Sequence, residues 1–407
     1  MDQIIKTNRL VATTTIGLLT AVIYHFFIMK IYFGFGYPYD TFLFLPDDRF
    51  MDLVNPLQMI KDFSPYTNNK EGIPANYFPF TYLILYPFSF ISLGDSIIIF
   101  LLIFTAYTFK ITNYFIGKKS TSKYENIRNV FVLSFFTYPF LFTFDRGNIE
   151  AIVFIFEALF LISYLQKRSY ISAIFLSLAA SMKFYPAFLA IIFIKNRQFK
   201  QFGLCTLLTI VISVISLSIF NDGNLIQNIA DFQKNLKDFN KLYMLNDDLN
   251  SNGLSIFSLI KFELASIKII LSDLSESQTK ILLIYFISFC LISYLLINYY
   301  ILKFENVLWK QLMLIVSSSL ILFNVSYDYK MISLLLPIFL YLNDEKKYKF
   351  DSFYICGFSL LLIPKQIAVK SGDFGYFMIS NFLNLAIILG FIVIIMIEKK
   401  YDKEVTI

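Results

Sequence analysis

Three carboxylates stand close together in a chain that otherwise carries little charge. Asp47, Asp48 and Asp52 fall within six positions, whereas only 16% of all residues are charged and 57% are hydrophobic. Carboxylates at this spacing could take a proton from a hydroxyl group, or bind a divalent cation through their oxygens. The structural alternative is a solvated loop in which an aspartate caps a helix. If the chain turns helical after Pro46, Asp48 and Asp52 lie one turn apart on the same face.

A second polar group interrupts the apolar sequence further along. Asp145 and Arg146 could pair with each other at a helix start, beside the turn residues Gly147 and Asn148. Glu150 lies a further turn into an apolar helix, where an ionisable side chain is costly and usually faces a cavity. The forked donors of Arg146 suit a phosphate group. We expect Arg146 to bind phosphate, and Asn148 and Glu150 to contact substrate.

Lys183 separates two apolar stretches, 170–182 and 185–195, each too short to cross a bilayer alone. Pro186 interrupts the backbone hydrogen bonds at this junction. Broken helices inside a membrane are tolerated only where they line a cavity or are buried in protein. The alternative is a lysine at a span end that reaches for the interface. We expect Lys183 and Tyr185 to bind the phosphate of a lipid.

Three weaker candidates are Asn252, Asp328 and Tyr77. Asn252 could form a loop over a substrate cavity or only a turn, and Asp328 could contact substrate or form a surface pair with Lys330. The ring of Tyr77 could stack on a sugar. The sequence contains no P-loop, no dinucleotide glycine pattern, no zinc-type His/Glu pair and no serine-hydrolase elbow. A sugar donor that is not a nucleotide sugar is therefore favoured.

Membrane helices must position these residues. The chain has 407 residues and a mean hydropathy of +0.64. Because apolar runs long enough to cross a bilayer recur throughout, we expect an all-α polytopic membrane protein with about 11–13 spans, including short broken helices. The expected spans are 10–30, 95–116, 128–144, 147–165, 170–182, 185–195, 202–220, 279–302, 309–325, 329–343, 351–364 and 375–397.

Basic residues recur in alternate loops, as the positive-inside rule requires of cytoplasmic loops. Both termini are then cytoplasmic and the aspartate cluster is outside. The net charge of +6 follows from this bias and indicates no nucleic-acid partner. We expect one domain, 1–407, whose parts are a first outer catalytic loop with a surface helix at 77–92, core spans, an outer loop and C-terminal spans: 35–94, 95–220, 221–277 and 278–397. Trp309 is expected to anchor a helix at the membrane interface.

The order of these motifs resembles that of the polytopic GT-C glycosyltransferases, and in particular the polyprenyl-phosphate-mannose-dependent mannosyltransferases of glycosyltransferase family 87. The resemblance covers roughly residues 40–340. The chain departs from the family pattern in carrying three acids where one aspartate dominates, and Phe80 where a second proline is usual. The segments that carry the resemblance are the acidic first loop, Pro65-Tyr66, Tyr77-Phe78-Pro79, Arg146-Gly147-Asn148-Ile149-Glu150, Ala180-Ser181-Met182-Lys183-Phe184-Tyr185-Pro186, Ser251-Asn252-Gly253-Leu254 and Ser326-Tyr327-Asp328-Tyr329.

The resemblance implies a GT-C fold and an inverting transfer of a hexosyl group, mannosyl in the family. The donor would be a polyprenyl-phosphate sugar, and the acceptor a lipid-linked or polysaccharide glycan at the outer face of the cell membrane. Asp52, or else Asp48, would be the base, while Arg146 and Lys183 would neutralise the leaving phosphate. Family members often manage without a bound ion, and the resemblance leaves the requirement for a divalent cation open. Asp47 and Asp48 are the residues that would hold a divalent cation.

Two other functions fit the same features. A transporter or flippase of lipid-linked saccharides would also have broken helices and charges at a cavity. Against it, the sequence contains no detectable internal repeat, and its ionisable groups cluster on one membrane face. An oligosaccharide polymerase or ligase would use a large outer loop late in the chain, and residues 221–277 could supply one.

Overall fold

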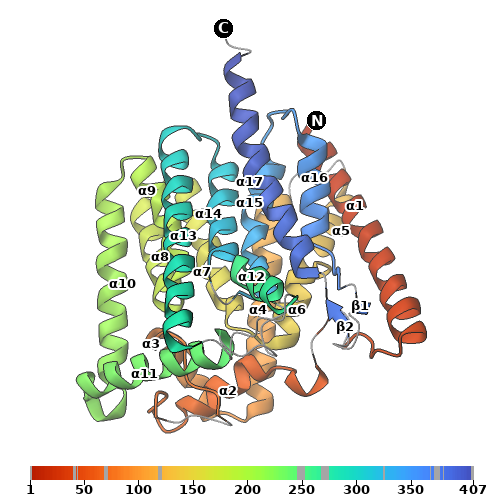
Figure 1. The fold of residues 1–407 in the computed structure, drawn as a ribbon. Helices are drawn as coiled ribbons and strands as arrows, with labels where there is room; N and C mark the ends of the chain where they lie inside the picture. Colours follow the sequence, from red (N-terminus) through yellow and green to blue (C-terminus); the bar gives the residue numbers. More distant parts are fainter. Residues whose placement is uncertain are drawn as a thin grey trace.

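The chain folds into a bundle of helices that run between two ends (Figure 1). The computed structural model describes residues 2–39, 43, 45–67, 72–117, 122–244, 253–266, 275–323, 326–366, 368–370, 376–378 and 380–404. Within these residues, five helices are long and apolar enough to cross a membrane, and one bent pair makes a sixth candidate. Shorter apolar helices pack among them. The expected all-α polytopic membrane fold is confirmed.

The first part of the chain forms α1 (Asp2–Ile23), its π-helical continuation η1 (Tyr24–Tyr32), η2 (Pro46–Asp48), α2 (Met51–Ile60), α3 (Pro79–Leu85), η3 (Tyr86–Phe90), α4 (Leu93–Ile116), α5 (Lys123–Phe135), α6 (Tyr138–Arg146), α7 (Glu150–Leu165), α8 (Ser169–Met182), η4 (Tyr185–Ala190), α9 (Ile191–Lys195) and α10 (Phe199–Ile219). The second part forms η5 (Asn221–Gly223), α11 (Leu225–Met244), α12 (Ile256–Ser266), α13 (Glu276–Lys303), α14 (Leu308–Ile321), η7 (Asp328–Leu334), α15 (Leu335–Asn343), α16 (Asp351–Leu361), the antiparallel strands β1 (Ala368–Lys370) and β2 (Tyr376–Met378), and α17 (Ser380–Glu404).

Local sequence explains where several elements begin. Ser92 and Ser122 cap α4 and α5, because each serine oxygen accepts the backbone N–H three residues later. Pro139 stands in the first turn of α6, so the expected span 128–144 is a helix pair bent by 49°. The break expected after α8 is also present, since Lys183 has extended backbone between α8 and η4.

The bundle has one end with the termini and an opposite end with α2, α3 and α11 (Figure 1). The helix expected at 77–92 is present at this second end as α3 and η3. α7 packs against α8, α8 against α10, and α3 against both α8 and α10. These contacts fix the segments that surround the candidate site.

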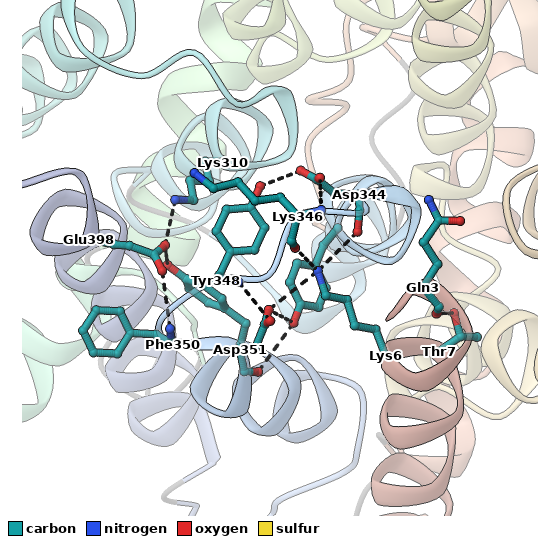
Figure 2. Close-up of polar contacts among 12 residues, drawn as sticks. Gln3, Lys6, Thr7, Lys310, Asp344, Lys346, Tyr348, Phe350, Asp351 and Glu398 are labelled. Atoms are coloured by element: carbon teal, nitrogen blue, oxygen red, sulfur yellow. Dashed lines mark hydrogen bonds and ion pairs between the residues drawn. The ribbon is translucent and has the colours of Figure 1, made fainter. Parts of the chain in front are cut away.

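A buried network of polar side chains lies at the end that carries the termini, and Figure 2 shows its contacts. Lys6 of α1 lies 3.7 Å from Asp351 and donates to the backbone oxygen of Lys346. Lys310 of α14 forms an ion pair of 2.7 Å with Glu398 of α17, and both side chains are 2% exposed or less. Because the hydroxyl of Tyr354 in α16 also donates to Glu398, the network ties four helices, α1, α14, α16 and α17, to one another.

Trp309 lies beside this network and not at a membrane interface. Its side chain is 1% exposed and packs edge-on against Tyr341, Tyr348 and Tyr354. The expected interface anchor is therefore wrong. The α14 helix is surrounded on all sides by other helices, so its first turn is protein core.

Candidate active site

A cavity of about 500 Å³ lies among the elements at the end opposite the termini. Its walls come from α2, the segment before α3, the end of α6, the junction of α8 and η4, α11 and η7. Segments far apart in the sequence therefore share one space. Among the described residues, the lining side chains that carry a formal charge are Asp48, Asp52, Arg146, Lys183 and Lys330.

Asp48, Asp52 and Arg146 form the acidic half of the cavity. Arg146 donates from Nη2 to Oδ1 of Asp52 at 2.6 Å and from Nε to Oδ2 at 3.2 Å. Its Nη1 donates to the backbone oxygen of Asp48 at 2.9 Å and lies 3.6 Å from the Asp48 carboxylate. One cation thus faces two carboxylates, which leaves this half formally negative.

Asp48 and Asp52 do not lie on one continuous helix, so the condition under which they would share a helical face is not met. Asp48 ends η2, whereas Asp52 belongs to α2. Phe50 between them has a φ of 59°, in the left-handed region that bulky residues rarely adopt. The two aspartates instead converge through their shared contact with Arg146, a tertiary contact that no local spacing reveals.

Gly147 allows α2 to approach the turn between α6 and α7. Its φ of 59° is left-handed, which glycine adopts without steric cost. A Cβ atom here would lie 3.2 Å from Cβ of Leu53 and 3.4 Å from Cα of Phe50. The Phe50 N–H also donates to the Asp145 carbonyl at 2.9 Å. The tight turn therefore brings α2 against the residues that complete the acidic half.

Asn148 supports the acidic half from behind. Its Nδ2 donates to Oδ2 of Asp52 at 2.6 Å, and its Oδ1 accepts the Glu150 N–H at 2.9 Å as α7 begins. The side chain is fully buried and is not among the residues that line the cavity. Asn148 thus orients Asp52, whereas the sequence predicted a direct substrate contact.

Lys183 is held at the break between α8 and η4 by a buried carboxylate. Its Nζ lies 2.7 Å from Oε1 of Glu150, whose other oxygen accepts the hydroxyl of Tyr185. The ammonium also lies 5.1 Å from the ring centre of Tyr77 and 5.5 Å from that of Tyr329. Such rings attract a cation through their negative faces. Glu150 is fully buried, so it positions Lys183 and does not itself face the cavity.

Lys330 is the site residue that sequence reasoning missed. The alternative interpretation, a surface pair with Asp328, is wrong, because Asp328 is buried against Tyr138 while Lys330 lines the cavity. Its Nζ lies 5.8 Å from the ring centre of Tyr185, and it lines the same cavity as Lys183. A lysine in an apolar segment was the available signal. We call Lys183 and Lys330 the basic half of the cavity.

A second carboxylate of α7 fixes the segment that carries Lys330. Glu157 is 1% exposed and accepts the hydroxyl of Ser333 in η7 at 2.5 Å. Glu150 and Glu157 lie two turns apart on α7, so they share a face. That face of α7 therefore holds both elements of the basic half.

The structure does not bring every predicted residue to the cavity. Asp47 is exposed and is not a lining residue. Asp328 is buried, accepts the hydroxyl of Tyr138 at 2.9 Å and does not line the cavity. Burial raises the pKa of the Asp328 carboxyl. Asn252 lies outside the described residues.

Contrary to the structural alternative, Asp145 and Arg146 do not pair with each other; each contacts a different part of the first loop. Asp145 is buried and lies 3.7 Å from Arg49, while the hydroxyl of Tyr39 donates to it at 3.3 Å. Consecutive residues of one helix thus hold two different parts of the first loop. Asp145 holds the segment before α2, and Arg146 holds α2 itself.

The chemistry of the cavity is that of charged groups and neutral aromatic hydroxyls. Burial, and then the nearby Asp52, raises the pKa of Tyr77 well above its usual value, so this tyrosine keeps its proton. Within the described ranges, no group of three or more His, Cys, Asp or Glu side chains could hold a metal ion. Asp48, one of the two suggested cation ligands, faces Arg146 instead.

Comparison with known protein families gives a match to this chain. The profile of glycosyltransferase family 87 matches residues 76–322, which is more than half of the chain. No curated protein matches the sequence at a significant level. The matched range contains Arg146, Asn148, Glu150 and Lys183, begins after Asp52 and ends before Lys330. The chain therefore belongs to glycosyltransferase family 87.

Proposed function

We propose that this glycosyltransferase moves a hexosyl group, mannosyl by its family resemblance, from a polyprenyl-phosphate donor to a sugar hydroxyl. The observation that carries the proposal is the division of one cavity into an acidic half and a basic half. A base must face the acceptor hydroxyl while cations face the departing phosphate. Membership in a glycosyltransferase family favours sugar transfer over transport.

Asp52 is the proposed base. Each carboxylate oxygen can accept about two hydrogen bonds. Oδ2 of Asp52 already accepts from Arg146 and Asn148, whereas Oδ1 accepts only from Arg146 among the contacts described. Oδ1 therefore keeps capacity for an acceptor hydroxyl, and the arginine and asparagine fix its direction. Asp48, whose side chain is 38% exposed, is the alternative base.

Lys183 and Lys330 are the proposed phosphate-binding residues. In the transfer step, the acceptor oxygen bonds to the anomeric carbon as its proton passes to Asp52. The bond from that carbon to the phosphate oxygen breaks, and its electron pair leaves with polyprenyl phosphate, which gains one negative charge. Lys183 and Lys330 both line the cavity, and one carboxylate, Glu150, pairs with Lys183, so the basic half is formally positive and favours this charge. Attack opposite the leaving group inverts the anomeric configuration.

The proposed location of the reaction is the outer face of the cell membrane. Basic residues gather at the end that carries the termini. Arg128 donates to the side-chain oxygen of Asn8, and Lys6 and Lys195 donate to the backbone oxygens of Lys346 and Leu302. By the positive-inside rule, this end is cytoplasmic. The cavity, at the opposite end, then opens toward the outer leaflet, where a lipid-linked donor enters from the side.

The test is a transfer assay with membranes that contain the full-length protein. Labelled polyprenyl-phosphate mannose is compared with a labelled nucleotide sugar, each with and without a chelator. We expect label to enter glycan or glycolipid from the lipid donor alone, and the chelator to have no effect. Label from the nucleotide sugar alone would refute the proposed donor. Loss of transfer with the chelator would show that the reaction requires a divalent cation, for which Asp47 and Asp48 are the candidate ligands.

A further inference from the structure

Carboxamide and aromatic side chains make up one part of the cavity lining, which we call the rim. Asn55 of α2, Asn76 before α3 and Asn240 of α11 all belong to it, together with Phe78 and Phe239. Carboxamides both donate and accept hydrogen bonds, as sugar hydroxyls require. Aromatic rings offer flat apolar faces beside them. This combination matches the alternating polar and apolar surfaces of a sugar ring.

The charges of the cavity argue against an anionic ligand at this rim. The cations that line the described cavity are Arg146, Lys183 and Lys330. Arg146 already faces two carboxylates, and the two lysines belong to the basic half. Asn55 stands three residues after Asp52 on α2, and both line the cavity, so an anionic sugar at the rim would meet the formally negative acidic half without a cation of its own. Like charges in a partly desolvated site repel strongly.

Helix α11 is anchored independently of its cavity face. Asn235 donates to the backbone oxygen of Tyr66 at 2.9 Å, and Asn228 donates to those of Leu217 and Phe220. Asn240 lies beyond these anchors on the same helix and is exposed. Its replacement therefore removes a cavity group without removing a contact that holds α11 in place.

We propose that this rim, formed by Asn55, Asn76, Asn240, Phe78 and Phe239, binds an uncharged sugar unit of the acceptor and selects it against anionic sugars. The identification of this sugar as part of the acceptor rests on the proposed function. Binding of the sugar at the rim does not itself depend on transfer. The acidic half then faces the bound sugar, and the basic half remains available to the donor phosphate.

The test measures binding of defined probes to the purified full-length protein in lipid nanodiscs, by saturation-transfer NMR without any donor. The probes are methyl glucoside, methyl mannoside and the anionic methyl glucuronide. We expect each neutral glycoside to bind at least about 10-fold more tightly than the glucuronide. Asn240→Ala removes two hydrogen bonds that the carboxamide would make with the sugar, so binding of the neutral glycosides should weaken by about 5- to 10-fold. Asn76→Ala should behave alike.

Gln233→Ala is the matched control, because Gln233 is an exposed amide of the same helix that does not line the cavity. It should bind the neutral probes as the wild type does. Equal binding of the glucuronide, unchanged binding by Asn240→Ala, or absence of neutral binding would overturn the proposal. Failure of the proposed function differs, since neutral binding would persist while no label passes from the lipid donor.

Discussion

Arg146 donates hydrogen bonds to both carboxylate oxygens of Asp52, with Nη2 2.6 Å from Oδ1 and Nε 3.2 Å from Oδ2. A bidentate contact of this kind fixes both the position and the plane of a carboxylate. The same guanidinium also contacts Asp48. Arg146 therefore belongs to the acidic half. For this reason we propose that Lys183 and Lys330, and not Arg146, bind the donor phosphate.

The first prediction concerns the base. Asp52→Asn keeps the shape of the side chain but cannot accept a proton, so kcat should fall by about 10²- to 10⁴-fold. Asp48→Asn is the matched control and should retain most activity, because Asp48 lies farther from Arg146 and is more exposed. Initial rates of label transfer in membranes measure both. The reverse order of the two variants would assign the base to Asp48.

The second prediction concerns the orientation of that base. Arg146→Lys keeps the charge but removes the fork that holds Asp52, so the carboxylate can shift. A displacement of about 1 Å from the productive geometry can cost about 10²-fold in rate. We expect kcat to fall by this order while the KM for donor changes little. Arg49→Lys, at an exposed arginine beside Asp145, is the control. A large rise in donor KM instead would mean that Arg146 binds the phosphate.

How far the sequence predicted this site depends on the range of each interaction. Lys183, Tyr185 and the turn after Arg146 stand at breaks in apolar helices, and such breaks are visible in hydropathy and in proline and glycine positions. Of the residues at these breaks, Arg146, Lys183 and Tyr185 line the cavity, whereas Gly147 and Asn148 do not. Local signals also predicted the bundle, because the length of an apolar run is a local property.

Contacts between segments that are far apart in the sequence could not be predicted from such local signals. Arg146 and Asp52 are separated by 94 positions, and nothing local distinguishes this pair from one between Arg146 and Asp145. Lys330 was missed for the same reason. Its neighbour Asp328 suggested a surface pair, whereas η7 turns the two residues into different environments. Trp309 was misplaced because sequence alone does not tell a lipid-facing helix from one enclosed by other helices.

The third prediction tests the basic half through Lys330. Lys183 is the poorer test, since its removal leaves Glu150 buried without its ammonium partner. Lys330→Met should raise the KM for lipid donor by roughly 10- to 100-fold, the value of one hydrogen bond to a charged group. Inhibition by free polyprenyl phosphate should weaken at least as much, because that product carries the extra charge. Both constants come from initial-rate assays.

Lys61→Met provides the control for Lys330→Met. Lys61 is exposed at the end of α2 and does not line the cavity. This variant should keep the wild-type KM for donor and the wild-type inhibition constant. An unchanged donor KM in Lys330→Met would remove Lys330 from the donor site and leave Lys183 as its cation.

The fourth prediction concerns stability at the end far from the cavity. Lys310→Met leaves Glu398 buried with only Tyr354 and a long contact to the Phe350 N–H among its described contacts. Breaking one partner of such a pair costs about 3–5 kcal/mol, whereas replacing both can be nearly neutral. We therefore expect a lower Tm for Lys310→Met in a detergent thermal scan.

The double variant Lys310→Met/Glu398→Gln should recover most of this loss, because the amide oxygen still accepts the Tyr354 hydroxyl without a buried charge. Lys303→Met, at an exposed lysine of α13, should leave Tm unchanged. The folded fraction of each variant should keep its transfer rate, since the network and the cavity lie at opposite ends of the bundle. If Lys310→Met were as stable as the wild type, or the double variant no more stable than the single one, the ion pair would not be what joins α14 to α17.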